Sequence, residues 1–430
     1  MILDASTCTT EFSHLNPLPA APRSDAAWEL IRALYPEWLQ KVQPALAGSA
    51  PLTPPADWTA LPDDPATPRE QLQVMAALPR RSIPAVHEHP VAVILAGGKG
   101  TRMAVDERQK SLCPILGRPA LTRTLDTCRA FGIRHFILIA GFGYRDVLRH
   151  VGLEDPGITF LYQEQQLGTG HAARLAARYL QSQGYHGDVL VVMGDKFITR
   201  RGFARLLRDH AARRPHLTIS TASKQAWPDS GRVLMDAAGQ VQAIIEKPDL
   251  VQSRWLRDFY HWPADPVPCP PLLDLALRYW NRPEKWKKLL GPDLWEALQT
   301  QPAIPKNNGW LPKPEDALRF AVTPALSLSG QEIEEQCGQV NISVYIFQSA
   351  PFYQTMEQLR PNNAQGELYL TDAVLELTRS CHSHGYCVLA SAMPHDYDIM
   401  GFNTREELDF IERSILEKGL LDENETDPRP

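Results

Sequence analysis

Residues 91–103 read VAVILAGGKGTRM, an apolar run followed at once by a glycine-rich turn. Six apolar residues in a row, 91–96, are typical of a strand in a parallel sheet that is covered on both faces. Three glycines in four positions then allow a sharp turn whose N–H groups, with Lys99 and Arg102, can face an anion. The spacing fits neither the Walker loop nor the dinucleotide-binding pattern. The segment therefore indicates a phosphate cradle, with a solvated strand-to-helix turn as the alternative.

Outward from this stretch, short apolar runs alternate with helical periods. The runs are residues 135–141, 158–163 and 188–195, and helices are predicted over 119–132 and 170–183. This alternation predicts an α/β fold: a Rossmann-like, three-layer arrangement around a mixed, mostly parallel sheet. Ligands of such sheets bind beyond the carboxyl ends of the strands. The loops after Ala96, Gln163 and Met193 are therefore the expected places for chemistry.

Length and composition exclude several classes of protein. The chain has 430 residues, 43% of them hydrophobic, and a formal charge of −6, which argues against nucleic-acid and membrane-surface partners. No apolar run is long enough to span a bilayer, and the first residues lack the pattern of a signal peptide. Seven scattered cysteines never form a C-x-x-C pair, which favours reduced thiols. We expect a soluble, cytoplasmic protein.

Proline divides the chain into segments. Residues 1–90 hold 14 prolines and 250–337 hold 12, against 6 in 91–249 and 5 in 338–430, and nine of the ten tryptophans follow the same division. Since proline is excluded from ladders and helix interiors, the two poor segments are expected to form the regular core. The division predicts a Pro-rich, partly helical N-terminal extension (1–90), a nucleotide-binding part (91–249), a Pro/Trp-rich insertion in which the strand–helix alternation stops (250–337), a closing part of the same domain (338–418) and a disordered tail (419–430).

Other candidate residues follow the strand ends. Lys110 could fold back over the glycine loop and meet a triphosphate, or be an ordinary surface lysine. Gln163 and the glycines of 167–171 could read the edge of a nucleobase. Asp195, directly after a buried strand, is best explained as a metal ligand, and a helix cap is its alternative. His171 is interpreted as a packing residue.

These elements, in this order, resemble the sugar-phosphate nucleotidylyltransferases, and most closely the uridylyltransferase domain of bacterial N-acetylglucosamine-1-phosphate uridylyltransferase. PNNAQGELYLTD at 361–372 and Gly401-Phe402-Asn403 extend the resemblance over 91–249 and 338–415. It implies a glycosyltransferase-A-like nucleotidyltransferase fold. The chain ends where the bacterial bifunctional enzymes continue into an acetyltransferase β-helix, so we expect no acetyl transfer.

The resemblance also implies site residues. The nucleotide would contact Leu95, Ala96, Gly97, Gly98, Lys99, Gly100, Thr101, Gln163, Gly168 and Thr169. Arg102 and Lys110 would hold its phosphates and, with Asp195, be the catalytic residues. Asp195 and Asn403 would share one Mg²⁺, and Gly231, Glu246 and Asn341 would bind the sugar.

The chain departs from the uridylyltransferase pattern at several positions. They are Gly98, Met193, the Asn341-Ile342-Ser343 segment, the Ile245-Glu246-Lys247-Pro248 segment, and above all Lys196, where the family has an apolar residue. A cation there would weaken the metal site or contact an acceptor phosphate. The insertion, between two candidate sugar contacts, is interpreted as a lid or specificity element, with a subunit contact in a homo-oligomer as the alternative.

The predicted reaction is transfer of a nucleotidyl group from UTP to a sugar 1-phosphate such as N-acetylglucosamine 1-phosphate. It would release pyrophosphate and form a nucleotide sugar. One alternative is the same reaction with GTP, dTTP or CTP, or with another hexose or cyclitol phosphate. The other is a non-catalytic, nucleotide-binding regulatory protein, and Lys196 is the reason for considering it.

Overall fold

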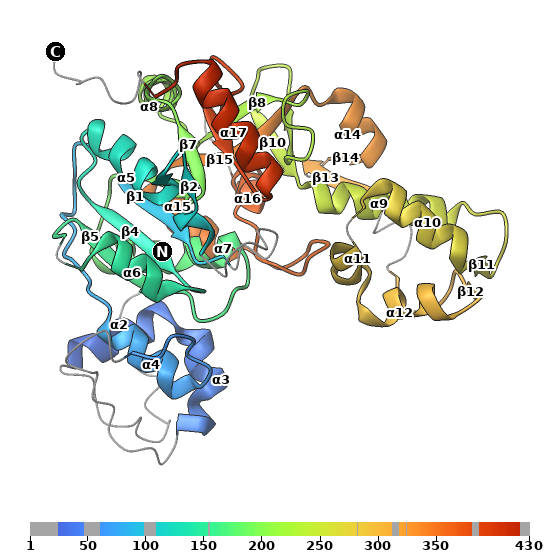
Figure 1. The fold of residues 1–430 in the computed structure, drawn as a ribbon, viewed down its shortest axis with the longest axis horizontal. Helices are drawn as coiled ribbons and strands as arrows, with labels where there is room; N and C mark the ends of the chain where they lie inside the picture. The colour runs from blue at the N-terminus through green and yellow to red at the C-terminus, as the bar shows by residue number, and fades with distance from the viewer. Residues whose placement is uncertain are drawn as a thin grey trace.

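The computed structural model describes residues 25–46, 61–98, 109–153, 155–281, 283–311, 318–323, 325–380 and 387–421. Among these residues, nine strands form one central sheet, in which β10, β9, β15, β6, β1, β4 and β5 are neighbours in that order and β8 and β16 are attached through β15 (Figure 1). The strands are β1 (Val91–Ala96), β4 (Phe136–Ala140), β5 (Ile158–Tyr162), β6 (Asp188–Met193), β8 (Leu217–Ser223), β9 (Arg232–Met235), β10 (Val241–Ile245), β15 (Gln339–Gln348) and β16 (Val388–Ala392).

The half of the sheet that holds the predicted site is parallel. Strands β6, β1, β4 and β5 pair in parallel, whereas β15 runs antiparallel to β6 and to β8. Every residue of β4 and β5 is buried, so both faces of this half are covered. The predicted α/β fold with a mixed sheet is confirmed. Because parallel strands end at the same edge, the loops after β1, β4, β5 and β6 meet there.

Helices and two small strand pairs surround this sheet. The helices are α5 (Ala120–Ala130), α6 (Tyr144–Val151), α7 (Thr169–Ser182), α8 (Arg200–Arg213), α15 (Ser349–Gln358), α16 (Asp372–Ser380), α17 (Arg405–Glu417) and the short 3-10 helix η2 (Lys110–Leu112). The strand pairs are β2 (Pro114–Ile115) with β3 (Arg118–Pro119), and β7 (Lys196–Ile198) with β17 (Ile399–Gly401). The helices predicted over 119–132 and 170–183 are confirmed.

Three N-terminal helices pack directly on the parallel half. They are α2 (Asp25–Leu34), α3 (Pro36–Leu46) and α4 (Pro68–Ala77), and α3 begins at Pro36. Trp28 and Trp38 belong to the same hydrophobic cluster as the residues of β1, β4 and β5. Figure 1 shows these helices beside β4, β5 and α6. The N-terminal segment is therefore continuous with the central core.

The insertion, where the strand–helix alternation was expected to stop, consists mainly of helices and short strand pairs outside the central sheet. Its elements are α9 (Lys247–Tyr260), β11 (Val267–Pro268), α10 (Cys269–Tyr279), α11 (Pro283–Leu290), α12 (Pro292–Thr300), β12 (Ala303–Ile304), β13 (Arg319–Thr323), β14 (Leu326–Ser329) and α14 (Gly330–Gln336). Four of its prolines, Pro270, Pro271, Pro283 and Pro292, occupy the first turn of a helix, where the missing N–H costs nothing. At these positions proline marks the start of a helix.

The cysteines of the described ranges agree with the expected reduced thiols. The five cysteines found there, Cys113, Cys128, Cys269, Cys337 and Cys387, are free and buried. In the same ranges no helix combines the length and the apolar character needed to cross a membrane. The predicted disordered tail lies almost entirely outside the described residues.

Candidate active site

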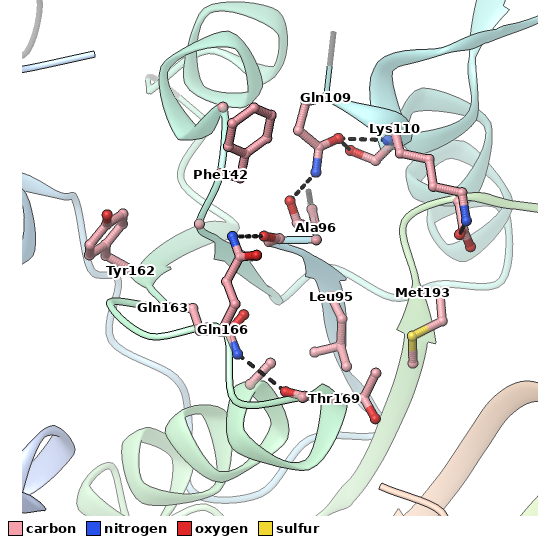
Figure 2. Close-up of a pocket in the computed structure, with 18 of the residues that line it drawn as sticks. Leu95, Ala96, Gln109, Lys110, Phe142, Tyr162, Gln163, Gln166, Thr169 and Met193 are labelled. Atoms are coloured by element: carbon pink, nitrogen blue, oxygen red, sulfur yellow. Dashed lines mark hydrogen bonds and ion pairs between the residues drawn. The ribbon is translucent and has the colours of Figure 1, made fainter. Parts of the chain in front are cut away.

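The carboxyl ends of the parallel strands surround a cavity of about 760 Å³. Its size lies within the range of pockets that bury a small ligand. Most of the predicted nucleotide and metal residues line it together: Leu95, Ala96, Gly97, Gly98, Lys110, Gln163, Gly168, Thr169, Asp195 and Asn403. Figure 2 shows Lys110 and Gln163 on opposite sides of Ala96. The predicted residues Lys99, Gly100, Thr101 and Arg102 lie outside the described residues.

Gly97 allows the closest approach between two of these strand ends. A side chain at this position would bring its Cβ within 2.8 Å of Gln163 Oε1 and 3.3 Å of the Gly141 backbone nitrogen. The Gly97 carbonyl accepts hydrogen bonds from the Phe142 N–H at 3.2 Å and from Gln166 Nε2 at 2.9 Å. Gly97 therefore cannot be replaced without displacing Gln163, which is the reason for a glycine there.

His171 orients the amide of Gln163. Gln163 Nε2 lies 3.2 Å from the Gly168 carbonyl and 3.2 Å from His171 Nδ1. Burial lowers the pKa of His171 to about 4, so the ring is neutral and its Nδ1 can accept this bond. Its Nε2 faces Glu164 Oε1 at 3.6 Å. Both donors of the Gln163 amide are thereby engaged, and His171 has a positioning role that its interpretation as a packing residue missed.

The 361–372 segment fastens the loop between β5 and α7. Gly168 has φ +105°, a conformation that only glycine adopts readily, and a Cβ there would lie 2.5 Å from the Leu368 carbonyl. The Leu368 N–H donates to the Leu167 carbonyl at 2.7 Å, and the Leu370 N–H donates to Thr169 Oγ1 at 3.1 Å. Two motifs about 200 residues apart in sequence thus form one wall of the cavity.

Asp195, Asn403 and Lys110 meet at the other end of the cavity. Asp195 lies in the turn between β6 and β7, and Asn403 follows β17, whose Gly401 pairs with Lys196 of β7. The ammonium of Lys110 forms an ion pair with Asp195 and lies 3.1 Å from Asn403 Oδ1. The helix cap considered for Asp195 is provided by Thr199 instead, which accepts from the Gly202 N–H at 3.1 Å.

This pair of oxygens fits a hard divalent cation. Asp195 Oδ2 and Asn403 Oδ1 already converge on one cation, the Lys110 ammonium, and Asp195 Oδ1 is a buried oxygen with no hydrogen-bond partner. Carboxylate and amide oxygens are the ligands that Mg²⁺ prefers. Burial alone would raise the pKa of Asp195, but Lys110 and Lys196 hold it below its usual value. The carboxylate is therefore ionised and available to a metal.

Lys196 is half-buried beside this site. Its Nζ lies so close to Gly401 that a Cβ at that glycine would be 2.4 Å away. Burial and the charge of Lys110 lower the pKa of Lys196, whereas Asp195 and Glu407 oppose that shift. The lysine therefore adds positive charge to the Asp195 end of the cavity without an observed hydrogen bond from its Nζ among the described residues.

The three predicted sugar residues lie together, but outside the first cavity. A Cβ at Gly231 would lie 3.1 Å from Glu246 Oε2, and the Asn341 N–H donates to the Gly231 carbonyl at 2.8 Å. Asn341 Nδ2 donates to the Tyr345 hydroxyl at 2.7 Å. Glu246 lines a second cavity of about 730 Å³, whereas Gly231 and Asn341 line neither of these two cavities.

Acidic groups are gathered around Glu246. Burial raises the pKa of Glu246. Burial, together with the neighbouring carboxylates, also raises the pKa values of Asp249 and Asp372 to about 7. The Tyr369 hydroxyl in the same neighbourhood is buried without a partner. Groups of this kind can donate and accept hydrogen bonds with sugar hydroxyls.

Several residues of the first cavity were missed from the sequence. Gln109 is buried, donates to the Ala96 carbonyl and accepts from the Ser111 N–H at 2.6 Å. Residues outside the family-like segments also line this cavity: Asp63, Asp64, Pro65 and Gln71 from the N-terminal segment, and Lys285 and Lys288 from α11. No motif marks them, since their place depends on how the added segments pack.

A fold with this strand-end site is typical of enzymes and binding proteins that take nucleotides. Residues 91–267 match the family model described as "Nucleotidyl transferase". The match covers less than half of the chain and agrees with the resemblance to the sugar-phosphate nucleotidylyltransferases.

Individual relatives agree with this match. "Bifunctional protein GlmU" of Geobacillus sp. (strain WCH70) is 27% identical over 328 residues, 76% of this chain and 52% of that protein. The protein of the same name from Pelotomaculum thermopropionicum is 27% identical over 333 residues, 77% and 53% of the two chains. This chain spans about half the length of these relatives. A solved structure of HddC from Yersinia pseudotuberculosis aligns with a TM-score of 0.42 and 14% identity. The alignment covers 76% of this chain and all of that one.

Proposed function

We propose that the protein is a Mg²⁺-dependent nucleotidyltransferase that transfers a nucleotidyl group from UTP to a sugar 1-phosphate, with N-acetylglucosamine 1-phosphate as the acceptor to test first. One observation carries the proposal. A single cavity joins a close-packed glycine turn (Gly97), an oriented amide (Gln163) and a cation-binding pair of oxygens (Asp195 and Asn403). Together these groups suit the phosphates, base and metal of a nucleoside triphosphate.

The reaction needs alignment and charge neutralisation more than acid–base catalysis. An oxygen of the acceptor phosphate, already anionic, forms a bond to the α-phosphorus, the bond from that phosphorus to the bridging oxygen of the β-phosphate breaks, and pyrophosphate leaves. Two polyanions must approach each other in line. Bound Mg²⁺ would offset the charge of the phosphates at Asp195 and Asn403. Lys110 supplies further positive charge at the same end of the cavity.

The acceptor would lie toward Glu246. This carboxyl group, Asp249, Asp372 and the unpartnered Tyr369 hydroxyl provide polar groups for a sugar. Lys196, at the Asp195 end, would face the acceptor phosphate. The insertion adjoins both cavities, since Lys288 lines the first and Gln252 of α9 lines the second, so it could influence the choice of either substrate.

Pyrophosphate release tests this proposal. Purified protein with Mg²⁺ is offered UTP, CTP, GTP, dTTP and ATP, each against a panel of sugar and cyclitol phosphates, and we expect release with one pair. Asp195→Asn should lower the rate more than about 100-fold by weakening the metal site, whereas Asp146→Asn, an exposed residue of α6, should not. Nucleotide binding without release from any pair would instead support the non-catalytic regulatory protein.

A further inference from the structure

Lys110 occupies the place that the divalent cation needs. Its ammonium contacts Asp195 Oδ2 and lies 3.1 Å from Asn403 Oδ1, the two oxygens assigned above to the metal. We propose that Lys110 is the resident cation of the nucleotide-free protein and that it exchanges with the metal when the nucleoside triphosphate binds. The inference rests on the proposed function, because it takes Asp195 and Asn403 as the metal ligands.

The two cations exclude each other at this position. A Mg²⁺ ion binds oxygen at about 2.0–2.1 Å, closer than an ammonium group does. An ion bound to Asp195 Oδ2 and Asn403 Oδ1 would therefore take the space and the acceptors that Lys110 now uses. The charge of the lysine adds repulsion, which is strong in a partly buried site. Metal binding requires Lys110 to move away.

The neighbouring charges make the exchange depend on the nucleotide. Lys196 also acts on the Asp195 carboxylate, so this one anion already faces two ammonium groups. Glu407, the next carboxylate, accepts a hydrogen bond from the Asn403 N–H. Without a nucleotide, a divalent ion would add two more positive charges beside these two ammonium groups. A nucleoside triphosphate brings the negative charge that the metal needs and offers phosphate oxygens to the displaced lysine.

Lys110 has the freedom to make this move. It begins η2 on the wall of the cavity, and its side chain is 15% exposed. Its four-carbon stem can turn without a change in the backbone. Gly97 and Gly98 line the same cavity, so the phosphates expected there would lie within the cavity that Lys110 also lines. One lysine would thus serve first as a placeholder for the metal and then as a phosphate ligand.

Thermodynamic linkage gives the measurable consequence. If nucleotide binding removes Lys110 from the metal oxygens, then nucleotide and metal each raise the affinity of the protein for the other by the same factor. Such coupling factors are typically about 5 to 150. The nucleotide-free protein should bind a divalent ion weakly, and removal of the lysine ammonium should restore that binding without any nucleotide.

The test is a titration of the nucleotide-free protein with Mn²⁺, followed by electron paramagnetic resonance of the free ion. Lys110→Met should bind Mn²⁺ about tenfold more tightly than the wild type. Lys110→Arg keeps a cation of similar reach and should remain a weak binder. Lys196→Met removes the other ammonium group that acts on Asp195 but is not seen to contact the two metal oxygens, so its gain should be clearly smaller. Thermal unfolding of each variant shows whether it is folded.

A second titration contains the non-hydrolysable α,β-imido analogue of UTP. The analogue should raise the Mn²⁺ affinity of the wild type more than that of Lys110→Met. Unchanged Mn²⁺ binding in folded Lys110→Met, or an equal gain in Lys196→Met, would overturn the exchange. The proposed function would survive such a result if pyrophosphate release persists in the wild type. Conversely, a gain in Mn²⁺ affinity specific to Lys110→Met, with no pyrophosphate release by the wild type, would support the exchange and contradict the proposed function.

Discussion

The two proline- and tryptophan-rich parts of the chain are built in different ways. The N-terminal helices α2–α4 bury Trp28 and Trp38 in the same cluster as the central sheet. The insertion helices α9–α12 instead bury Trp255 and Trp286 in a cluster of their own. The two segments are similar in composition. The N-terminal helices nevertheless belong to the central core, whereas the insertion helices form a separate packing unit.

Polar contacts follow the same difference. The Tyr35 hydroxyl donates to the Tyr162 carbonyl at 2.9 Å, next to Gln163, and Trp38 Nε1 donates to Gln71 Oε1 at 2.9 Å. The N-terminal helices thus reach the wall of the first cavity. In the insertion, α11 reaches the same cavity through the exposed ion pair of Lys288 with Glu367. We infer that the N-terminal helices support the nucleotide site and that the insertion adjusts it.

The largest expected effect is the loss of Trp38. Its side chain is 3% exposed, and truncation to alanine should lower the free energy of unfolding by about 3–5 kcal/mol. Since this cluster includes the sheet, hydrogen exchange should increase in β1, β4 and β5 as well as in α3. Mass spectrometry of the exchanged peptides measures this. Trp310→Ala, at a side chain that is 44% exposed, is the control and should change little.

Trp286→Ala should lower the free energy of unfolding by a comparable amount, but its effect on hydrogen exchange should be confined to the insertion. Trp286 is fully buried, packs against Trp255 and donates to the Trp280 carbonyl at 2.9 Å. Its truncation should raise hydrogen exchange in α9–α12 and leave β1, β4 and β5 protected. Affinity for the nucleoside triphosphate should change less than in Trp38→Ala. Increased exchange throughout the sheet would show that the insertion belongs to the same cooperative unit.

The smallest effect concerns the ion pair that ties α3 to α7. Arg178 donates to both oxygens of Glu37, at 2.6 and 2.8 Å, and its hydrogen bonds lower the pKa of Glu37 from 4.5 to about 2 although burial opposes this. A carboxylate with a lowered folded-state pKa stabilises the protein above pH 4.5, and this contribution is lost as the pH falls toward 2.

Glu37→Gln should therefore cost up to about 1 kcal/mol at pH 7, because the pair is partly exposed to solvent. It should also flatten the fall in stability between pH 4.5 and 2. Urea unfolding at a series of pH values measures both effects. Glu29→Gln, at an exposed residue of α2, serves as the control. An equally steep acid dependence in Glu37→Gln would exclude this pair as a link between the N-terminal helices and the core.

The sequence predicted the parallel half of the sheet because its strands are continuous apolar runs that end at glycine or polar residues. It also identified Gln163, Asp195 and Asn403 as candidate site residues, because the motifs keep their order along the chain despite the large insertion. It did not show that His171 orients Gln163 or that Gln109 holds the Ala96 carbonyl. Those contacts depend on side-chain directions that no spacing rule encodes.

The added segments were the least predictable. The proline content of the insertion gave no sign of its helices, yet Pro283 and Pro292 begin α11 and α12, and Pro270 lies in the first turn of α10. Asp64 and Lys285 reach the first cavity only because of tertiary packing, which the local pattern around them does not contain. The separation of the predicted sugar residues from the first cavity likewise depends on tertiary packing and not on a motif.

The central claim is that the cavity at the parallel strand ends transfers a nucleotidyl group. The most direct test is ³¹P nuclear magnetic resonance of the protein with Mg²⁺, UTP and N-acetylglucosamine 1-phosphate, then with the other pairs. We predict that one pair is converted into a new diphosphodiester and pyrophosphate by the wild type and not by Asp195→Asn. No conversion of any pair by the wild type, or conversion at an unchanged rate by Asp195→Asn, would contradict the claim.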